Sequence, residues 1–213
     1  DRALGVTSAE EQPVLPKGNN LSLHLLELFT SRVAKVGMTD GIRQVLQEES
    51  DALRAYYEQA GILIARPAGG TSCRLAISAK GGTNAENHNH NDVGSYAVAL
   101  GSETMVGDQG GPNSYPGDYF NGDAPQKYKI KGSFGHPVPV VDGRTQSSGG
   151  KAKGVVLQKE FTNEKDVFSI DYTSAYSTPN LDKLIRTFVY DRQGKGSFTV
   201  GDEFTAKTPI RFE

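Results

Sequence analysis

The hydrophobic pattern of the chain changes its period near Ile62, and this change constrains the fold more than any other feature of the sequence. From there onward apolar residues alternate with polar ones, as at Cys73, Leu75 and Ile77, which is the pattern of half-buried β-strands. Turn-forming residues such as Gly149-Gly150 separate several runs of this kind. The further strands are expected at residues 96–100, 105–107, 138–141, 155–161, 167–172, 184–191 and 197–204. Many short strands with no helices between them predict an all-β domain, built as an antiparallel β-sandwich.

The first sixty residues carry apolar side chains at helical spacing instead. Residues 21–29 repeat leucine every three or four positions, and Asn20 can cap the helix that this spacing predicts. A second helix is expected to present one apolar face, made by Ile42, Val45, Leu46, Leu53, Tyr56 and Tyr57. Gly61 follows at a position where glycine often ends a helix. The sequence therefore predicts a short helical lead-in over residues 1–59 and a β-sandwich domain over residues 60–213.

Charge and hydrophobicity exclude two classes of partner. The 23 basic and 25 acidic residues give a net charge of −2, which provides no electrostatic basis for binding nucleic acid. No segment approaches the roughly 18 consecutive apolar residues of a membrane span. Cys73 is the only cysteine, so an intrachain disulfide cannot form.

Histidine and aspartate residues in the middle of the chain indicate a metal site. If the segment around them is extended, His88, His90 and Asp92 point to one face, where one imidazole can bind a metal and the other can face a substrate. Asp108 follows the next expected strand, and His136 directly precedes another. Neighbouring antiparallel strands would bring these groups together. Two imidazoles, one carboxylate and one water make a tetrahedral zinc site.

Two other interpretations of the His-x-His run stay open. The asparagines around His88 and His90 favour a turn whose side chains bond to the backbone, without any metal. A cupin-like metalloenzyme also places His-x-His on a β-sandwich. The cupin pattern has a glutamate a few residues later, but here no glutamate occurs before Glu103, so the cupin is the weaker match.

Four segments together resemble one known family. Residues 87–96 (NHNHNDVGSY) are similar to the HNHxDxGS-like motif of heparinase II/III-type polysaccharide lyases. Residues 107–110 (GDQG) resemble the Asp-x-Gly strand end of that family. Residues 135–143 (GHPVPVVDG), with Gln146, resemble its His-Asn…Val-Asp-Gly…Gln segment, and residues 60–66 (AGILIAR) resemble the first strand of its C-terminal β-sandwich domain.

The match covers residues 55–150 in the order and spacing of the family, and one departure is Pro137, where the family more often has asparagine. The resemblance implies that His90, Asp108 and His136 are the metal ligands. It implies one zinc ion with a mainly structural role, with calcium or another divalent ion as the alternative. The departure at Pro137 alters a loop contact and leaves the ligand set intact.

The resemblance also implies a reaction, the cleavage of uronic-acid-containing polysaccharides by β-elimination. In that chemistry a base, often a tyrosine, removes the C5 proton of the uronate, and the leaving oxygen is reprotonated. His88 would face the substrate cleft and orient the uronate. Tyr115 and Tyr119 lie between two of the expected metal ligands and are candidate catalytic residues, with surface packing as their alternative role.

Basic residues alternate around Tyr128 in the same segment. Lys127, Lys129 and Lys131 can form a cationic face for an anionic glycan, and we expect Tyr128, Lys127 and Lys129 to bind substrate. The same alternation also fits the solvated side of a strand.

The resemblance implies a partner domain as well. Lyases of this family pair the sandwich with a large N-terminal α/α toroid, which 213 residues are too few to contain. We therefore expect the helical lead-in to be a remnant or connector of an upstream toroid, and the chain to be inactive by itself. The expected partners are an acidic polysaccharide and that toroid, in the periplasm or outside the cell. A non-catalytic carbohydrate-binding module is the alternative of a different class.

Overall fold

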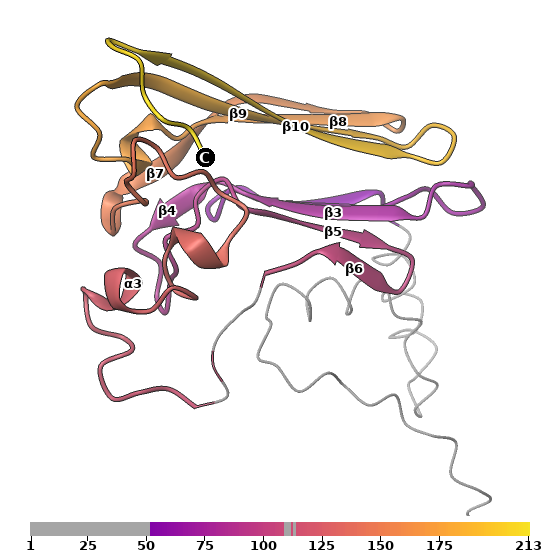
Figure 1. The fold of residues 1–213 in the computed structure, drawn as a ribbon. Helices are drawn as coiled ribbons and strands as arrows, with labels where there is room; N and C mark the ends of the chain where they lie inside the picture. Colours follow the sequence, from indigo (N-terminus) through magenta and orange to yellow (C-terminus); the bar gives the residue numbers. More distant parts are fainter. Residues whose placement is uncertain (1–51, 109–111, 113) are drawn as a thin grey trace, which may run out of the picture.

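The structure is a computed structural model that describes residues 52–108, 112 and 114–213. Two antiparallel five-stranded sheets lie face to face, which confirms the expected β-sandwich (Figure 1). The first sheet has the order β1-β2-β3-β5-β6, with strands Arg54–Tyr57, Ile62–Ala65, Leu75–Lys80, Tyr96–Leu100 and Glu103–Val106. The second has the order β10-β9-β8-β7-β4, with strands Ser197–Ala206, Leu181–Asp191, Lys165–Asp171, Gly149–Phe161 and Gly82–Asn84.

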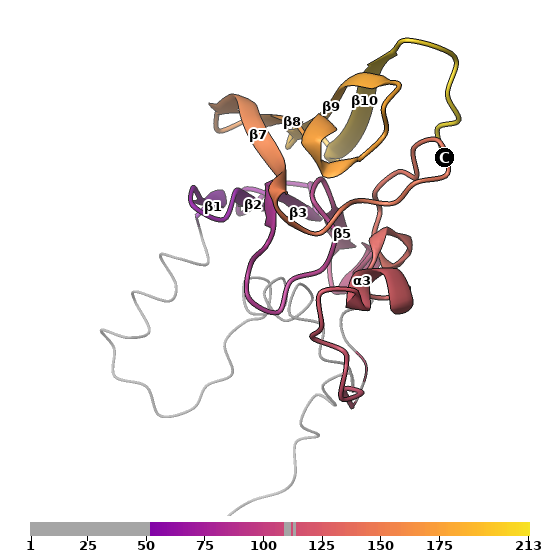
Figure 2. The ribbon, with the colours of Figure 1, turned by 90° about the vertical axis from the view of Figure 1, so that its left-hand side faces the viewer.

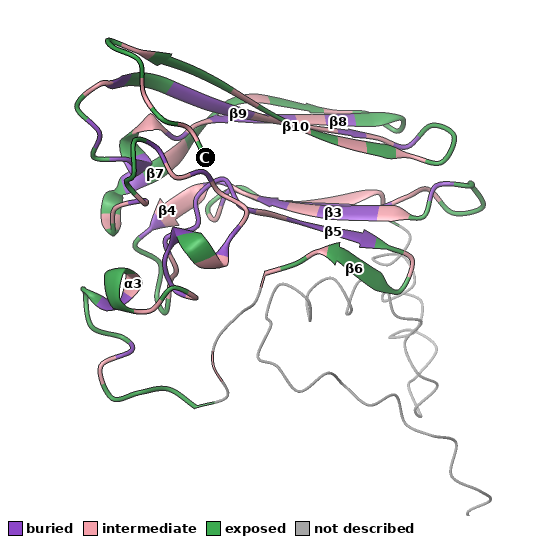
Figure 3. Cartoon of the chain, viewed as in Figure 1, coloured by how far each residue is buried: buried purple, intermediate pink, exposed green. Residues whose placement is uncertain are grey.

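The core lies between the two sheets, and buried residues lie along strands of both of them (Figure 3). The alternation of side chains builds this core from both sides. Leu63 and Ile77 point inward from the first sheet and meet Phe168, Leu184 and Phe188 from the second. Each of these five side chains is at most 1% exposed. Removing their apolar surface from water is the main force that holds the two sheets together.

The first strand corrects one expectation. Residues 53–57 were expected to end a helix, but Arg54–Tyr57 forms strand β1 and pairs with β2 through a tight turn. Gly61 ends that turn with φ 62°, and a Cβ there would lie 2.5 Å from the backbone nitrogen of Gly82. Tyr56 packs against the sandwich core, so tertiary contacts override the helical spacing. The rest of both expected helices lies outside the described residues.

Another expected strand, at residues 138–141, is also absent. Only Val141 forms bridges there, to Arg144 and to Phe212 near the C-terminus. Pro137 and Pro139 lack the N–H groups that a strand ladder needs, which explains the interruption. The strands expected at residues 96–100, 155–161, 167–172, 184–191 and 197–204 all correspond to observed strands, whereas β4 was not expected.

One end of the sandwich gathers the long connections (Figures 1 and 2). The connection from β4 to β5 lies there with the connection from β6 to β7, which contains the short helix α3 (Ala124–Lys127) and the 3-10 turn η1 (Ser133–Gly135). A second 3-10 turn, η2 (Thr173–Ala175), packs beside β7. No helix in the described part of the chain has the length and apolar character to span a membrane.

Candidate metal centre

The histidine motif forms a turn, which is the alternative that its asparagines favour, and is not an extended segment. The backbone N–H of Asn89 donates to the carbonyl of Glu86 at 3.1 Å, and His88 adopts φ 60°, in the left-handed region. Short polar residues favour such local bonding over a strand. The turn separates the two imidazoles: the ring of His88 contacts Phe120 at 4.5 Å between centroids, whereas that of His90 lies 5.1 Å from His136.

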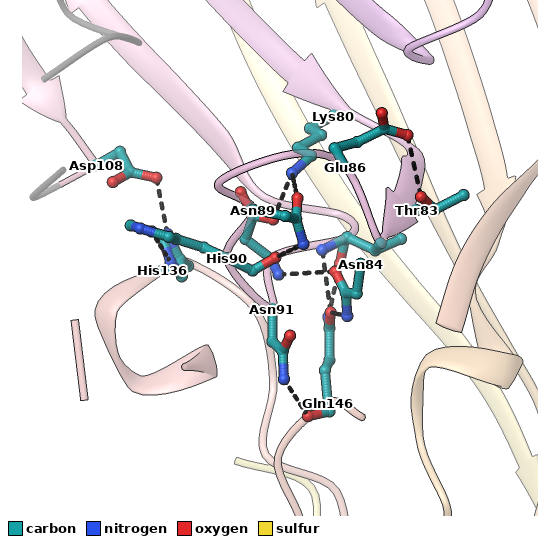
Figure 4. A network of polar contacts seen from close by, with 12 residues as sticks. Lys80, Thr83, Asn84, Glu86, Asn89, His90, Asn91, Asp108, His136 and Gln146 are labelled. Carbon is teal, nitrogen blue, oxygen red and sulfur yellow. Dashed lines mark hydrogen bonds and ion pairs between the residues drawn. The ribbon is translucent and has the colours of Figure 1, made fainter. Parts of the chain in front are cut away.

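Three side chains from distant segments converge on the other side of this turn (Figure 4). His90 comes from the β4–β5 connection, Asp108 follows β6, and His136 follows η1. Nδ1 of His90 lies 3.2 Å from Nε2 of His136, and Nδ1 of His136 lies 2.7 Å from Oδ2 of Asp108. One ligand-type atom from each residue lies within 4.8 Å of the others.

The electrostatics of this group suit a cation. Burial is the main cause that lowers the pKa of His90 to about 4, and repulsion by His136 acts in the same direction, against the attraction of Asp92 and Asp108. His90 is therefore neutral at pH 7, with a ring lone pair available. Two imidazoles and a carboxylate are a donor set that zinc binds readily, so the residues fit the metal that the sequence predicts.

A buried hydrogen-bond network holds the motif in place (Figure 4). Gln146 is 1% exposed; its Oε1 accepts from Nδ2 of Asn84 and from the backbone N–H of Val93, and its Nε2 donates to the carbonyl of Val93. Asn91 donates to the carbonyl of Gln146 at 2.9 Å. These bonds give partners to buried polar groups, and the network therefore fixes the course of the backbone on either side of His90.

Arg186 ties the two histidine segments to the second sheet. One guanidinium nitrogen donates to the carbonyl of Gly94 at 2.8 Å and to that of Pro137 at 2.7 Å. The opposite side of the guanidinium pairs with Asp202 in two hydrogen bonds. No sequence motif predicts this role for Arg186, although a basic residue that lies between the apolar pair Leu184-Ile185 and the apolar run 188–190 is a signal for such a role.

The expected catalytic tyrosines occupy different environments. Tyr115 is 47% exposed and packs against Tyr119 with ring centroids 5.0 Å apart. Tyr119 is only 1% exposed, and its hydroxyl has no hydrogen-bond partner among the described residues. Burial raises the pKa of Tyr119, so its hydroxyl stays protonated at neutral pH. The structure thus brings Tyr115, but not Tyr119, to the surface.

The expected substrate-binding residues near α3 also lie in different environments. Lys127 pairs with Asp118, and the hydroxyl of Tyr128 donates to the same carboxylate. Lys129 is exposed. Lys131 is buried, and its Nζ donates to the carbonyl of Tyr119 at 2.8 Å. The three lysines therefore do not share one face.

Comparison with known proteins supports the fold alone. No protein-family model matches the chain, and no curated protein matches it. Among solved structures it is similar to heparan sulfate lyase HepC from Pedobacter heparinus, with a TM-score of 0.60, 17% identity and 87% of this chain covered. A mutant of the same lyase gives a TM-score of 0.60, 18% identity and 78% coverage. This chain spans 28% and 25% of the lengths of those two chains.

Proposed function

We propose that this chain is the C-terminal sandwich part of a polysaccharide lyase that cleaves uronic-acid-containing polysaccharides by β-elimination. One observation carries the proposal: a single turn presents His90 to a ligand group with Asp108 and His136, and presents His88 to its other side. The sandwich fold, which is similar to that of a heparan sulfate lyase, supports the same conclusion. The other parts of the lyase, including an upstream α/α toroid, belong to this proposal.

In this proposal His90, Asp108 and His136 hold one zinc ion. The ion would supply a fixed point that joins three segments of the two long connections at the end of the sandwich, and its role is structural. The ligands come from segments before β5, after β6 and before β7, so their shared ion would stabilise the fold together with the site. Calcium is less suited, because it prefers oxygen ligands and two of these three ligands are nitrogens.

His88 acts on the substrate side. In β-elimination a base takes the C5 proton, the electron pair forms the C4=C5 double bond, the C4–O bond breaks, and the leaving oxygen receives a proton. Removal of the C5 proton becomes easier when the adjacent carboxylate is neutralised by a donor. We assign this donor role to His88. The strained backbone at His88, with φ 60°, is consistent with a residue held in place for function.

In this proposal the toroid supplies the main catalytic tyrosine, which acts as the base. Tyr115 is the candidate for a further catalytic contact from this chain, because it is exposed. Tyr119 would act by supporting Tyr115 and Phe120, whose rings it contacts. The chain by itself should then lack turnover. A protein of this activity would work in the periplasm or outside the cell, where acidic polysaccharides occur.

Two alternatives differ in the site that they require. A cupin-like centre would place both histidines of the motif on one metal, but the ligand group in the described part of the chain contains His90 without His88. A carbohydrate-binding module would bind the glycan and leave it intact. This second alternative predicts the same metal content, so only an activity measurement separates it from a lyase.

The test compares this chain with the longer protein that contains it. Both are incubated with heparan sulfate, chondroitin, alginate and ulvan, and the ultraviolet absorbance of the unsaturated uronate is followed. We expect product from the longer protein on at least one polymer and none from this chain. His88→Ala in the longer protein should lower turnover at least about tenfold, whereas Lys195→Ala, at an exposed position in the β9–β10 turn, should not.

Three outcomes would contradict the proposal. Robust turnover by this chain alone would refute its dependence on a toroid. Saturated products from the longer protein would indicate hydrolysis instead of elimination. Binding without any cleavage by the longer protein would favour the carbohydrate-binding module.

A further inference from the structure

A groove of about 460 Å³ lies beside the histidine turn. Most of its lining is uncharged, and asparagine is the most frequent residue in it, with five side chains from Asn84, Asn87, Asn89, Asn91 and Asn121. His88 and Phe120 add two rings, and Glu86 and Lys131 are the charged groups of the lining. Amides, aromatic rings and few charges are typical of a surface that binds a hydroxyl-rich molecule.

Three of the asparagines form a fixed wall. Asn84 and Asn91 donate their side-chain amides to the segment around Gln146, and Asn89 accepts a hydrogen bond from Lys80 (Figure 4). Their donors and acceptors are therefore largely occupied within the protein. This wall gives the groove a preformed shape, which lowers the entropy lost when a ligand binds.

Three other polar side chains of the lining are available to a ligand. Asn87, His88 and Asn121 are exposed, and their side chains form no hydrogen bond to other residues in the described part of the chain. Phe120 is 47% exposed, so one part of its ring faces solvent beside these groups. A sugar ring can pack its C–H face on such an aromatic ring while its hydroxyls bond to the amides.

Lys131 is the feature of this groove that points to a charged ligand. It is 5% exposed, and its ammonium uses one of its three donors, to the carbonyl of Tyr119. It lies 5.0 Å from the ring centroids of both Tyr119 and Phe120, yet it forms no ion pair with a carboxylate in the part of the chain that the structure describes. The one acid of the lining, Glu86, accepts a hydrogen bond from Thr83. A buried ammonium without a counter-ion is unfavourable, and an anionic ligand group would remove that deficit.

We infer that this groove is a subsite for an acidic sugar, and that Lys131 is the residue that recognises the acidic group. The ring of the sugar packs on Phe120 beside His88, its hydroxyls bond to Asn87 and Asn121, and its carboxylate or sulfate ester binds Lys131. This inference rests on the proposed function, because it assumes that the ligand is a glycan. The inference adds a residue that determines specificity. Lys131 takes the place of Lys127 and Lys129 as the expected contact with the acidic group.

The test is equilibrium binding by calorimetry with three probes, which separate carboxylate from sulfate. They are an unsulfated tetrasaccharide of alternating glucuronate and N-acetylglucosamine, its carboxyl-reduced form, and a sulfated heparan tetrasaccharide. Lys131→Met keeps the length and apolar stem of the side chain and removes only the ammonium. Lys129→Met is the matched control, since it removes an exposed ammonium two residues away.

We expect Lys131→Met to weaken binding of an acidic tetrasaccharide at least about tenfold, because it removes a charge-assisted hydrogen bond. The carboxyl-reduced probe should bind this variant and the wild type equally, which also shows that the groove is intact. Lys129→Met should change no affinity by more than about twofold. Phe120→Ala should weaken both acidic and reduced probes, because the ring packs on the sugar itself. A larger loss for the sulfated probe than for the glucuronate probe supports the inference and assigns the sulfate ester to Lys131.

The inference would be overturned if Lys131→Met weakened the binding of acidic and reduced probes equally, or if it weakened the binding of neither probe type. Lys131 would then be a packing residue. The proposed function would survive that result if the longer protein still forms unsaturated product. If the wild type binds none of the three probes, the subsite is refuted, and the absorbance assay then decides separately whether the protein is a lyase.

Discussion

Nδ1 of His90 lies 3.2 Å from Nε2 of His136, although 46 residues separate them in sequence. Two unprotonated ring nitrogens at this distance repel each other, so either a proton or a cation must lie between them. Asp108 then bonds to the second nitrogen of His136. This arrangement makes the metal content of the chain the first property to measure.

The purified wild-type chain should contain about one zinc ion, and His136→Ala should lose it. Because metal binding is linked to folding, the wild type should gain about 2.7 kcal/mol when free zinc is 100 times its Kd. Elemental analysis gives the first result, and chemical denaturation with and without zinc gives the second. A well-folded wild type without metal, whose stability zinc does not change, would refute the site.

His88→Ala should keep its metal, whereas His90→Ala should lose it. The reason is the turn, which places His88 against Phe120 and only His90 beside His136. The two variants remove the same group two residues apart, so each serves as the control for the other. Equal loss of zinc in both would mean that His88 is a ligand, as in a cupin-like centre.

The metal-free chain should lose stability as the pH falls from about 6.5 toward 4. Burial lowers the pKa of folded His90 to about 4 from 6.5, so the unfolded chain binds the proton first. The contribution of neutral His90 to the free energy of unfolding is therefore complete above pH 6.5 and is lost between pH 6.5 and about 4. Because one proton is involved, the free energy of unfolding changes by less than about 1.4 kcal/mol per pH unit. Urea titrations in EDTA at several pH values measure it. His90→Gln should flatten the dependence, and an unchanged slope in that variant would contradict this assignment.

Gln146→Ala should lower the free energy of unfolding by about 2 kcal/mol or more, because it removes the hydrogen bonds that Gln146 makes to the buried N–H and carbonyl groups of Val93 and to Asn84. It should also weaken zinc binding, since the same network holds the backbone beside His90. The matched control is Gln126→Ala, an exposed residue of α3 whose loss should change stability by less than about 0.5 kcal/mol. Denaturation and zinc titration of both variants test this, and equal zinc affinity would show that the network serves the fold alone.

Some of this protein is determined by its sequence. Alternation at Leu75 and Ile77 identifies a strand because successive side chains point to opposite faces of any sheet, whatever it packs against. The same alternation predicts most strands of the second sheet. Because many short strands follow one another without helices, it also predicts the sandwich. The chemical types of His90, Asp108 and His136 likewise indicate a metal-type donor set, because imidazole and carboxylate groups are the ligands that zinc prefers wherever they lie in a chain.

Tertiary structure decided the rest, because it depends on contacts between distant residues. Tyr56 has helical spacing in the sequence, yet it lies in a strand, since its ring packs against Phe161 and Phe168 of the second sheet. The turn that separates His88 from His90 is held by Gln146. This glutamine bonds to Val93, although more than fifty residues separate the two in sequence. The burial of Lys131 beside exposed Lys129 follows from the path of one irregular connection. Local geometry fixes where strands form, whereas burial and long-range hydrogen bonds determine which side chains meet, and these are properties of the folded chain alone.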